Sequence, residues 1–169
     1  MKATEVLADA YERIAEVVHD AVEGLSAEEL NARIDPKANS ITWLVWHLTR
    51  VQDDHVAEAS GLERVWTAQD WFTRFALPLP AAATGYGHTP RQVGTVLVES
   101  GELLLGYFDA VHEQSTGFIR GLTATDLERV VDAGWDPPVT LGVRLVSVLA
   151  DDLQHAGQAA FVRGALQRR

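Results

Sequence analysis

The sequence predicts an all-α fold in which four long helices form a bundle. Apolar residues recur at three- and four-residue spacings over long segments, as on one face of an amphipathic helix. Residues that begin or end helices bound these segments. No segment alternates between apolar and polar residues over a convincing length, so we expect no β-sheet. Four amphipathic helices of this length pack as a four-helix bundle.

The first predicted helix covers residues 4–24 and ends near Gly24. Its apolar stripe consists of Leu7, Tyr11, Ile14, Val18, Ala21 and Leu25. The letters SAEE at 26–29 form a capping box, which indicates a further short turn. The second helix begins at Ser40, runs through ITWLVWHLTRVQDDHVAEAS and ends at Gly61. We expect the following segment, ERVWTAQDWFTRF, to lie across the bundle.

The segment ALPLPAAATGYGHTP has three prolines and two glycines in fifteen residues and predicts a loop. Thr89 and Pro90 then predict the start of the third helix, as a cap followed by a first-turn proline. Its apolar side would contain Leu97, Leu104, Phe108, Val111, Phe118 and Leu122. TDLE at 125–128 reads as another capping box, and DAGWDPPVT as a second loop. The fourth helix would begin near Thr140 and run to the end of the chain.

The composition limits the classes of protein that fit this sequence. At 169 residues and 47% hydrophobic content, the chain is expected to be one globular domain covering residues 1–169. No apolar run approaches the ~20 residues of a membrane span. The beginning of the chain does not resemble a signal peptide, so a cytoplasmic location is expected. The net charge of −10, with no basic run except the terminal RR, disfavours nucleic acid and anionic membranes as partners.

The chain contains no cysteine. This excludes disulfides, thiolate metal ligands and a cysteine nucleophile. If thiol chemistry occurs here, the thiol must come from another molecule.

Three residues form a candidate metal site. His47 lies in the apolar run ITWLVWHL, where a buried imidazole needs a partner. Asp151 and His155 are four residues apart, so they share one helix face with the apolar residues Val148 and Ala159. With His47 from a facing helix they would hold a cation and leave coordination positions open for water or substrate. The alternative is a buried Asp–His hydrogen bond without metal.

Asp152 competes with Asp151 for the role of carboxylate ligand, although the spacing favours Asp151 and leaves Asp152 as a supporting residue. Asp54 is two helical turns, roughly 10 Å, from His47, which is too far to share one ion. The remaining histidines are expected to be solvated or bonded in the structure, and His55 is the one whose acidic neighbours could shift its pKa. The tryptophans are expected in the core or, alternatively, in a ligand-pocket wall: Trp43, Trp46, Trp66 and Trp71.

The motifs WLVWHL and DDLQHAGQAAFVRG resemble the DinB/YfiT-like superfamily, especially its mycothiol-transferase-like branch. The resemblance implies a four-helix bundle with up-down-down-up connections, a homodimer, and a metal site at the positions of His47, Asp151 and His155. Many members have histidine where this chain has Asp151. The related N-terminal domain of the mycothiol-dependent maleylpyruvate isomerases is similar to this chain in using a carboxylate there. Those isomerases carry an additional C-terminal domain, so their particular activity is not expected here.

These observations favour a metal-dependent enzyme that transfers a low-molecular-weight thiol to a small electrophilic substrate. Zinc suits two histidines and a carboxylate, and iron or nickel fits the same set. Mycothiol as the thiol is implied by the resemblance; the two lysines against twelve arginines also suit the high-GC genomes of actinobacteria. One alternative is a non-catalytic metal- or small-ligand-binding protein of a stress response. Another is a purely structural dimeric bundle in which Asp151 and His155 are simply paired.

Overall fold

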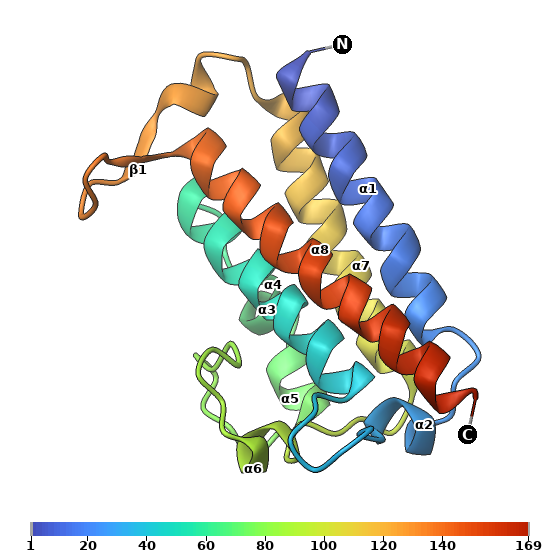
Figure 1. Cartoon of the computed structure of the whole chain (residues 1–169). Helices are drawn as coiled ribbons and strands as arrows, with labels where there is room; N and C mark the ends of the chain where they lie inside the picture. Colours follow the sequence, from blue (N-terminus) through green and yellow to red (C-terminus); the bar gives the residue numbers. More distant parts are fainter. Residues whose placement is uncertain (1, 169) are drawn as a thin grey trace.

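Four long helices form the bundle in the computed structural model, which describes residues 2–168. They are α1 (Ala3–Val22), α3 (Ile41–Ser60), α7 (Gly101–Gly121) and α8 (Leu141–Leu166). Both α7 and α8 pack against α1 and α3, whereas α1 and α3 barely meet. Figure 1 shows α1 and α8 running in one direction and α3 and α7 in the other, which is the up-down-down-up order. The predicted all-α fold is confirmed.

Short elements connect the long helices. They are α2 (Ala27–Asn31), α4 (Val65–Ala68), α5 (Trp71–Phe75), α6 (Pro90–Val93), a 3₁₀ turn (Asp126–Glu128), β1 (Val130–Asp132) and β2 (Val139–Thr140). The segment from α4 to α6 runs along α3, with α4 behind the middle of that helix and α5 and α6 toward its lower end (Figure 1). Within residues 2–168, none of the helices combines the length and low charge that crossing a membrane requires.

Several helix boundaries follow from the predicted caps. The Ser26 hydroxyl accepts a hydrogen bond from the Glu29 amide, and the Glu29 carboxylate accepts one from the Ser26 amide. The Ser40 hydroxyl accepts from the Trp43 amide at the start of α3, and the Thr140 hydroxyl accepts from the Val143 amide at the start of α8. Gly61 ends α3 in the left-handed region at φ 74°, where a side chain would be strained. These side chains satisfy amides that the first helical turn leaves without partners.

The third long helix begins later than predicted. Thr89 caps only the short α6, and α7 starts at Gly101 with Ser100 as its cap. Asn31 holds the intervening segment extended, because its side chain bonds both the carbonyl (2.8 Å) and the amide (3.1 Å) of Val98. Leu97 therefore belongs to this segment and is exposed, and its assignment to the apolar side of the helix was wrong.

Two further predictions about this half of the chain were wrong. The reciprocal cap lies at Thr123 and Asp126, and Thr125 makes no side-chain cap. The strands β1 and β2 form an antiparallel pair where no sheet was expected. They contain only three and two residues, which is too short for a period-two pattern to be visible.

A buried charged cluster attaches α4 to α3. Asp53 is 1% exposed and accepts hydrogen bonds from the Val65 and Trp66 amides, each at 2.8 Å. Its carboxylate also accepts one from the Tyr107 hydroxyl at 2.8 Å and pairs with the buried Arg50 guanidinium at 3.4 Å. Asp53 thus caps a helix from a distance and neutralises a charge inside the bundle.

Candidate metal centre

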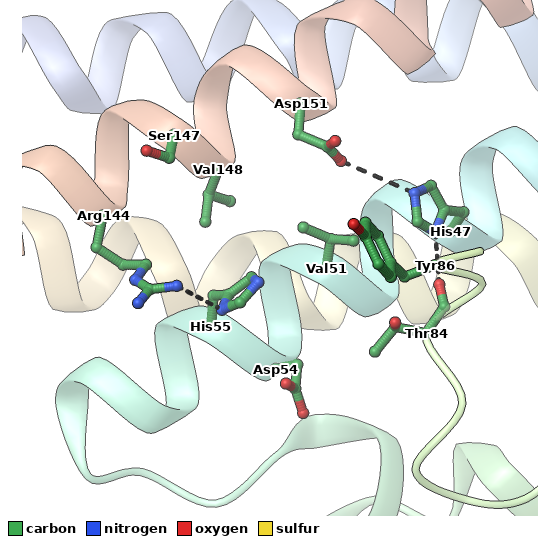
Figure 2. Close-up of a pocket in the computed structure, with 10 residues that line it drawn as sticks. All are labelled: His47, Val51, Asp54, His55, Thr84, Tyr86, Arg144, Ser147, Val148 and Asp151. Atoms are coloured by element: carbon green, nitrogen blue, oxygen red, sulfur yellow. Dashed lines mark hydrogen bonds and ion pairs between the residues drawn. The ribbon is translucent and has the colours of Figure 1, made fainter. Parts of the chain in front are cut away.

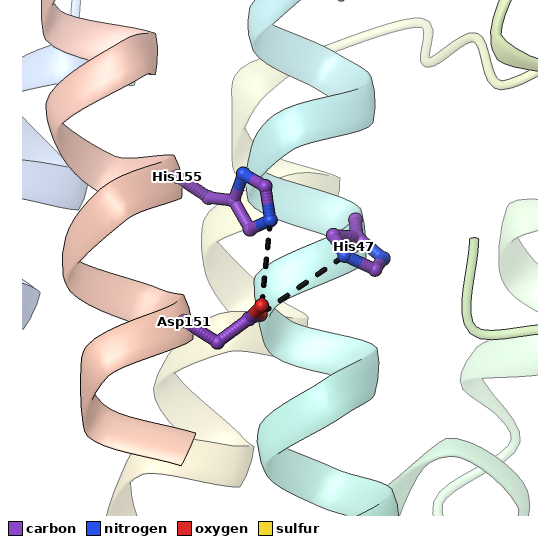
Figure 3. Close-up of side chains that lie close together, drawn as sticks. All are labelled: His47, Asp151 and His155. Atoms are coloured by element: carbon purple, nitrogen blue, oxygen red, sulfur yellow. Dashed lines mark ion pairs between the residues drawn. The ribbon is translucent and has the colours of Figure 1, made fainter. Parts of the chain in front are cut away.

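The structure brings the three predicted ligands together between α3 and α8 (Figure 3). One ligand atom from each of His47, Asp151 and His155 lies within 4.8 Å of the others. Nε2 of His47 is 4.0 Å from Oδ2 of Asp151, and Nε2 of His155 is 3.6 Å from Oδ1. Both distances exceed an ordinary hydrogen bond, so the three groups surround a small space that they do not close themselves.

Backbone and aromatic contacts fix the orientation of His47. Its Nδ1 donates a hydrogen bond to the Thr84 carbonyl oxygen at 2.5 Å, because that oxygen can only accept. Nε2 therefore keeps its lone pair toward Asp151. The Trp43 ring stacks on the imidazole with centroids 4.6 Å apart. Gly85 (φ 94°) lies so close that a Cβ there would be 2.7 Å from Nδ1 of His47.

His155 is oriented in the same manner. Its Nδ1 lies 3.0 Å from Oε1 of Gln158, one turn further along α8, and donates to it. Its Nε2 lone pair is thereby directed to Asp151. Metal-ligating histidines in proteins commonly donate their other N–H to an oxygen of this kind.

The charges of the three groups are set by their surroundings. The adjacent His155 imidazole lowers the pKa of Asp151, although partial burial opposes this shift. Burial lowers the pKa of His47, and its hydrogen bond to Thr84 only partly offsets that effect. The Asp151 carboxylate raises the pKa of His155. An ionised Asp151 with two imidazole lone pairs is the donor set that a divalent cation needs.

One atom of Asp151 bears on whether these residues could hold a metal. Oδ2 of Asp151 is buried and has no hydrogen-bond partner among the described residues. Leaving a buried carboxylate oxygen without a partner costs free energy. A cation between the three side chains would satisfy this oxygen together with both Nε2 atoms.

Asp152 has a different position from the one considered for it. Its side chain is 0% exposed and does not belong to the ligand group. Burial raises the pKa of Asp152 well above its usual range, and the charge of Asp151 adds to the effect. Because consecutive helical residues point about 100° apart, Asp151 and Asp152 face different parts of the bundle. Asp151 is thus the carboxylate that the geometry selects.

A pocket of about 400 Å³ opens beside the candidate metal centre (Figure 2). It is lined by His47, Val51, Asp54, His55, Thr84, Tyr86, Arg144, Ser147, Val148 and Asp151. Sequence reasoning missed Arg144 and Ser147, although they lie seven and four residues before Asp151 and hence on its face of α8. Thr84 and Tyr86 come from the loop, and their place here had no sequence signal. None of the four candidate wall residues lines the pocket; Trp43, Trp46, Trp66 and Trp71 are buried in the core.

The other histidines have ordinary partners, as expected. His19 bonds Glu23 and Asp109, and His112 bonds Glu12. His88 accepts from Nε1 of Trp43 at 3.2 Å. His55 differs, because it lines the pocket and contacts Arg144.

With this geometry established, the comparisons with known proteins assign the family. The family model described as the DinB superfamily matches residues 10–159. The chain belongs to the DinB superfamily. A crystal structure of a conserved protein from Enterococcus faecalis is similar to this DinB chain, with a TM-score of 0.93 and 31% sequence identity. The alignment covers 100% of this chain and 99% of that one. No curated protein matches the chain.

Proposed function

We propose that this DinB protein is a metal-dependent enzyme that transfers a low-molecular-weight thiol to a small electrophile. The observation that carries the proposal is the buried, unpartnered Oδ2 of Asp151, which faces Nε2 of His47 beside an open pocket. Zinc suits this donor set, and iron or nickel would also fit it.

The contacts of Asp151 argue against a purely structural Asp–His pair. In such a pair one carboxylate oxygen would accept from each imidazole at hydrogen-bonding distance. Instead the nearest nitrogens are 3.6 and 4.0 Å away, and one oxygen is buried without a partner. A cation between the three side chains would relieve this cost, whereas a simple Asp–His pair would not.

His47, Asp151 and His155 would hold the metal at the edge of the pocket, which His47 and Asp151 also line. A metal bound there would lower the pKa of an incoming thiol from about 8.5, so that a thiolate is available near neutral pH. The sulfur then bonds to carbon of the electrophile, the leaving group departs with its electron pair, and the thiol proton passes to water. Val51 and Val148 in the pocket wall would exclude water from the reacting carbon.

Mycothiol is our proposed thiol, supported by the resemblance and by the absence of cysteine in the chain. The test is conjugation of mycothiol to 1-chloro-2,4-dinitrobenzene by the zinc-loaded protein. We expect transfer above background that disappears in His155→Ala and persists in Gln154→Ala, a control on the exposed side of α8. A protein that binds zinc but transfers neither mycothiol nor other thiols would instead be a non-catalytic metal-binding protein.

We also propose that the protein is a homodimer formed through α8. The outer face of this helix carries exposed small and apolar residues at alternating three- and four-residue spacings: Val143, Val146, Ala150, Leu153, Gly157 and Ala160. This is the heptad pattern of a helix–helix seam, and its small residues would let two helices approach closely. The exposed Phe161 extends the same surface.

A further inference from the structure

The pocket extends well beyond the metal centre and has a second polar end. Arg144, Val148 and Asp151 line it from successive turns of α8, and Val51 and His55 line it from α3. Seven residues separate Arg144 from Asp151, a distance of about 10 Å along the helix axis. Between the two ends lie Val51, Val148 and Ser147, whose hydroxyl already bonds the Val143 carbonyl, so the pocket suits an elongated molecule with a polar group at each end (Figure 2).

Arg144 supplies a fixed cation at the far end. Its side chain is 19% exposed, and its guanidinium is held on two sides. Nη1 lies 3.2 Å from Nδ1 of His55, and Nη2 donates to Oδ2 of Asp132 at 3.1 Å. The three other N–H groups of the guanidinium have no acceptor among residues 2–168.

His55 supplies a second donor beside this cation. Because guanidinium nitrogens only donate, Nδ1 of His55 accepts from Arg144, and the ring proton is on Nε2. Burial and then the Arg144 charge lower the pKa of His55, which keeps the ring in this neutral form. Two acids lie near this end: Asp132 contacts the guanidinium itself, and Asp54 pairs with Arg64 and so opposes an anion less.

We propose that Arg144 and His55 form a carboxylate subsite, and that the natural ligand is a short acidic molecule whose opposite end reaches His47 and Asp151. A planar guanidinium with free N–H groups matches the two oxygens of a carboxylate. Asp132 holds the guanidinium in place and competes with the ligand for it. The role of the opposite end rests on the proposed function, whereas the carboxylate subsite does not require a metal.

The subsite is tested on the metal-free full chain by NMR titration with hexanoate and with hexanamide. Hexanoate should bind at least about tenfold more tightly than hexanamide, as expected for a charged hydrogen-bonded pair. Arg144→Gln should abolish this preference. Arg120→Gln, which removes an equal charge from an ion pair with Glu12 outside the pocket, should leave it unchanged.

Asp132→Asn separates binding from a structural role of Arg144. This variant breaks the same ion pair but leaves the cation in place, so the preference for hexanoate should persist or increase. Loss of the preference in Asp132→Asn would show that Arg144 acts only by holding the β1 segment. Equal affinities for hexanoate and hexanamide in the wild type would also overturn the proposal.

The bridging geometry is tested with cobalt-loaded protein and mercaptoalkanoic acids of increasing length, each compared with the mercaptoalkanol of the same length. Thiolate binding to cobalt is read from its charge-transfer absorbance. Beyond a threshold chain length, the mercaptoalkanoic acid should bind more tightly than the mercaptoalkanol of the same length. Arg144→Gln should remove this difference in affinity. Thiols that never reach cobalt would refute the thiol proposal alone, and an advantage independent of length would refute the bridging ligand.

Discussion

Gly85 offers a test of how the loop controls the metal centre without changing any ligand. Its φ of 94° and its closeness to His47 make two separate costs of a methyl group predictable. A left-handed backbone costs an alanine about 1–2 kcal/mol. The new Cβ would stand 2.7 Å from Nδ1 of His47 and displace the ring from Thr84, losing about 1 kcal/mol more.

We therefore expect Gly85→Ala to lower the free energy of unfolding by about 2–3 kcal/mol, or the Tm by about 4–12 °C. Because His47 loses the contact that orients Nε2, zinc affinity should fall about 10–100-fold. Thermal unfolding of the metal-free protein gives the first quantity, and competition with a chromogenic chelator gives the second.

Gly87→Ala is the matched control. Gly87 also has a positive φ, 71°, but a Cβ there meets no atom within 4 Å. Gly87→Ala should therefore lower the free energy of unfolding only by the backbone cost of about 1–2 kcal/mol, and it should keep wild-type zinc affinity. If Gly85→Ala also kept wild-type zinc affinity, the inference that this loop orients His47 would be wrong.

Three further predictions concern other parts of the molecule. Asp53→Ala should lower the free energy of unfolding, measured with urea, by about 3–5 kcal/mol, because Arg50 would keep a buried charge without its partner. The zinc stoichiometry of this variant should stay unchanged. His19→Gln should lower the free energy of unfolding of the protein more at pH 6 than at pH 9. Burial opposes protonation, but hydrogen bonds to Glu23 and Asp109 raise the pKa of His19, so its stabilisation is present below about 6.5 and lost above the folded pKa. Leu153→Glu should convert the proposed dimer to a monomer in sedimentation.

Each has an outcome that would refute its reasoning. A much smaller loss of unfolding free energy in Asp53→Ala would mean that Arg50 finds another partner or water. A His19 effect that grows with pH would contradict the direction of the shift. A wild-type monomer, or an unchanged dimer in Leu153→Glu, would exclude the α8 seam, whereas Gln154→Ala should have no effect on assembly.

The long helices and the grouping of His47, Asp151 and His155 were readable because both depend on local spacing. Caps such as Ser40 and Thr140 act within three residues of themselves. Asp151 and His155 share a face because a helix repeats every 3.6 residues, and His47 stood out as an imidazole in an apolar run. The spacing favoured Asp151 over Asp152, and the packing of α8 supports that choice, because Asp152 is turned away from the ligand group.

The loop and the far end of the pocket depend on contacts between distant residues. Thr84 reaches His47 across 37 positions, and Asn31 holds Val98 across 67. Neither pairing leaves a periodic pattern in the sequence. The late start of α7 was unpredictable for this reason, since the cap at Thr89 was real but the helix it began was short.

The central claim is most directly tested by metal content. The protein would be purified without a histidine tag or chelator, and zinc, iron and nickel would be measured per chain by elemental analysis. We expect about one metal ion per chain, lost in Asp151→Asn and His155→Ala but retained in Asp152→Asn. A wild type that remains empty when all three metals are offered, or loss in Asp152→Asn but not in Asp151→Asn, would contradict the account.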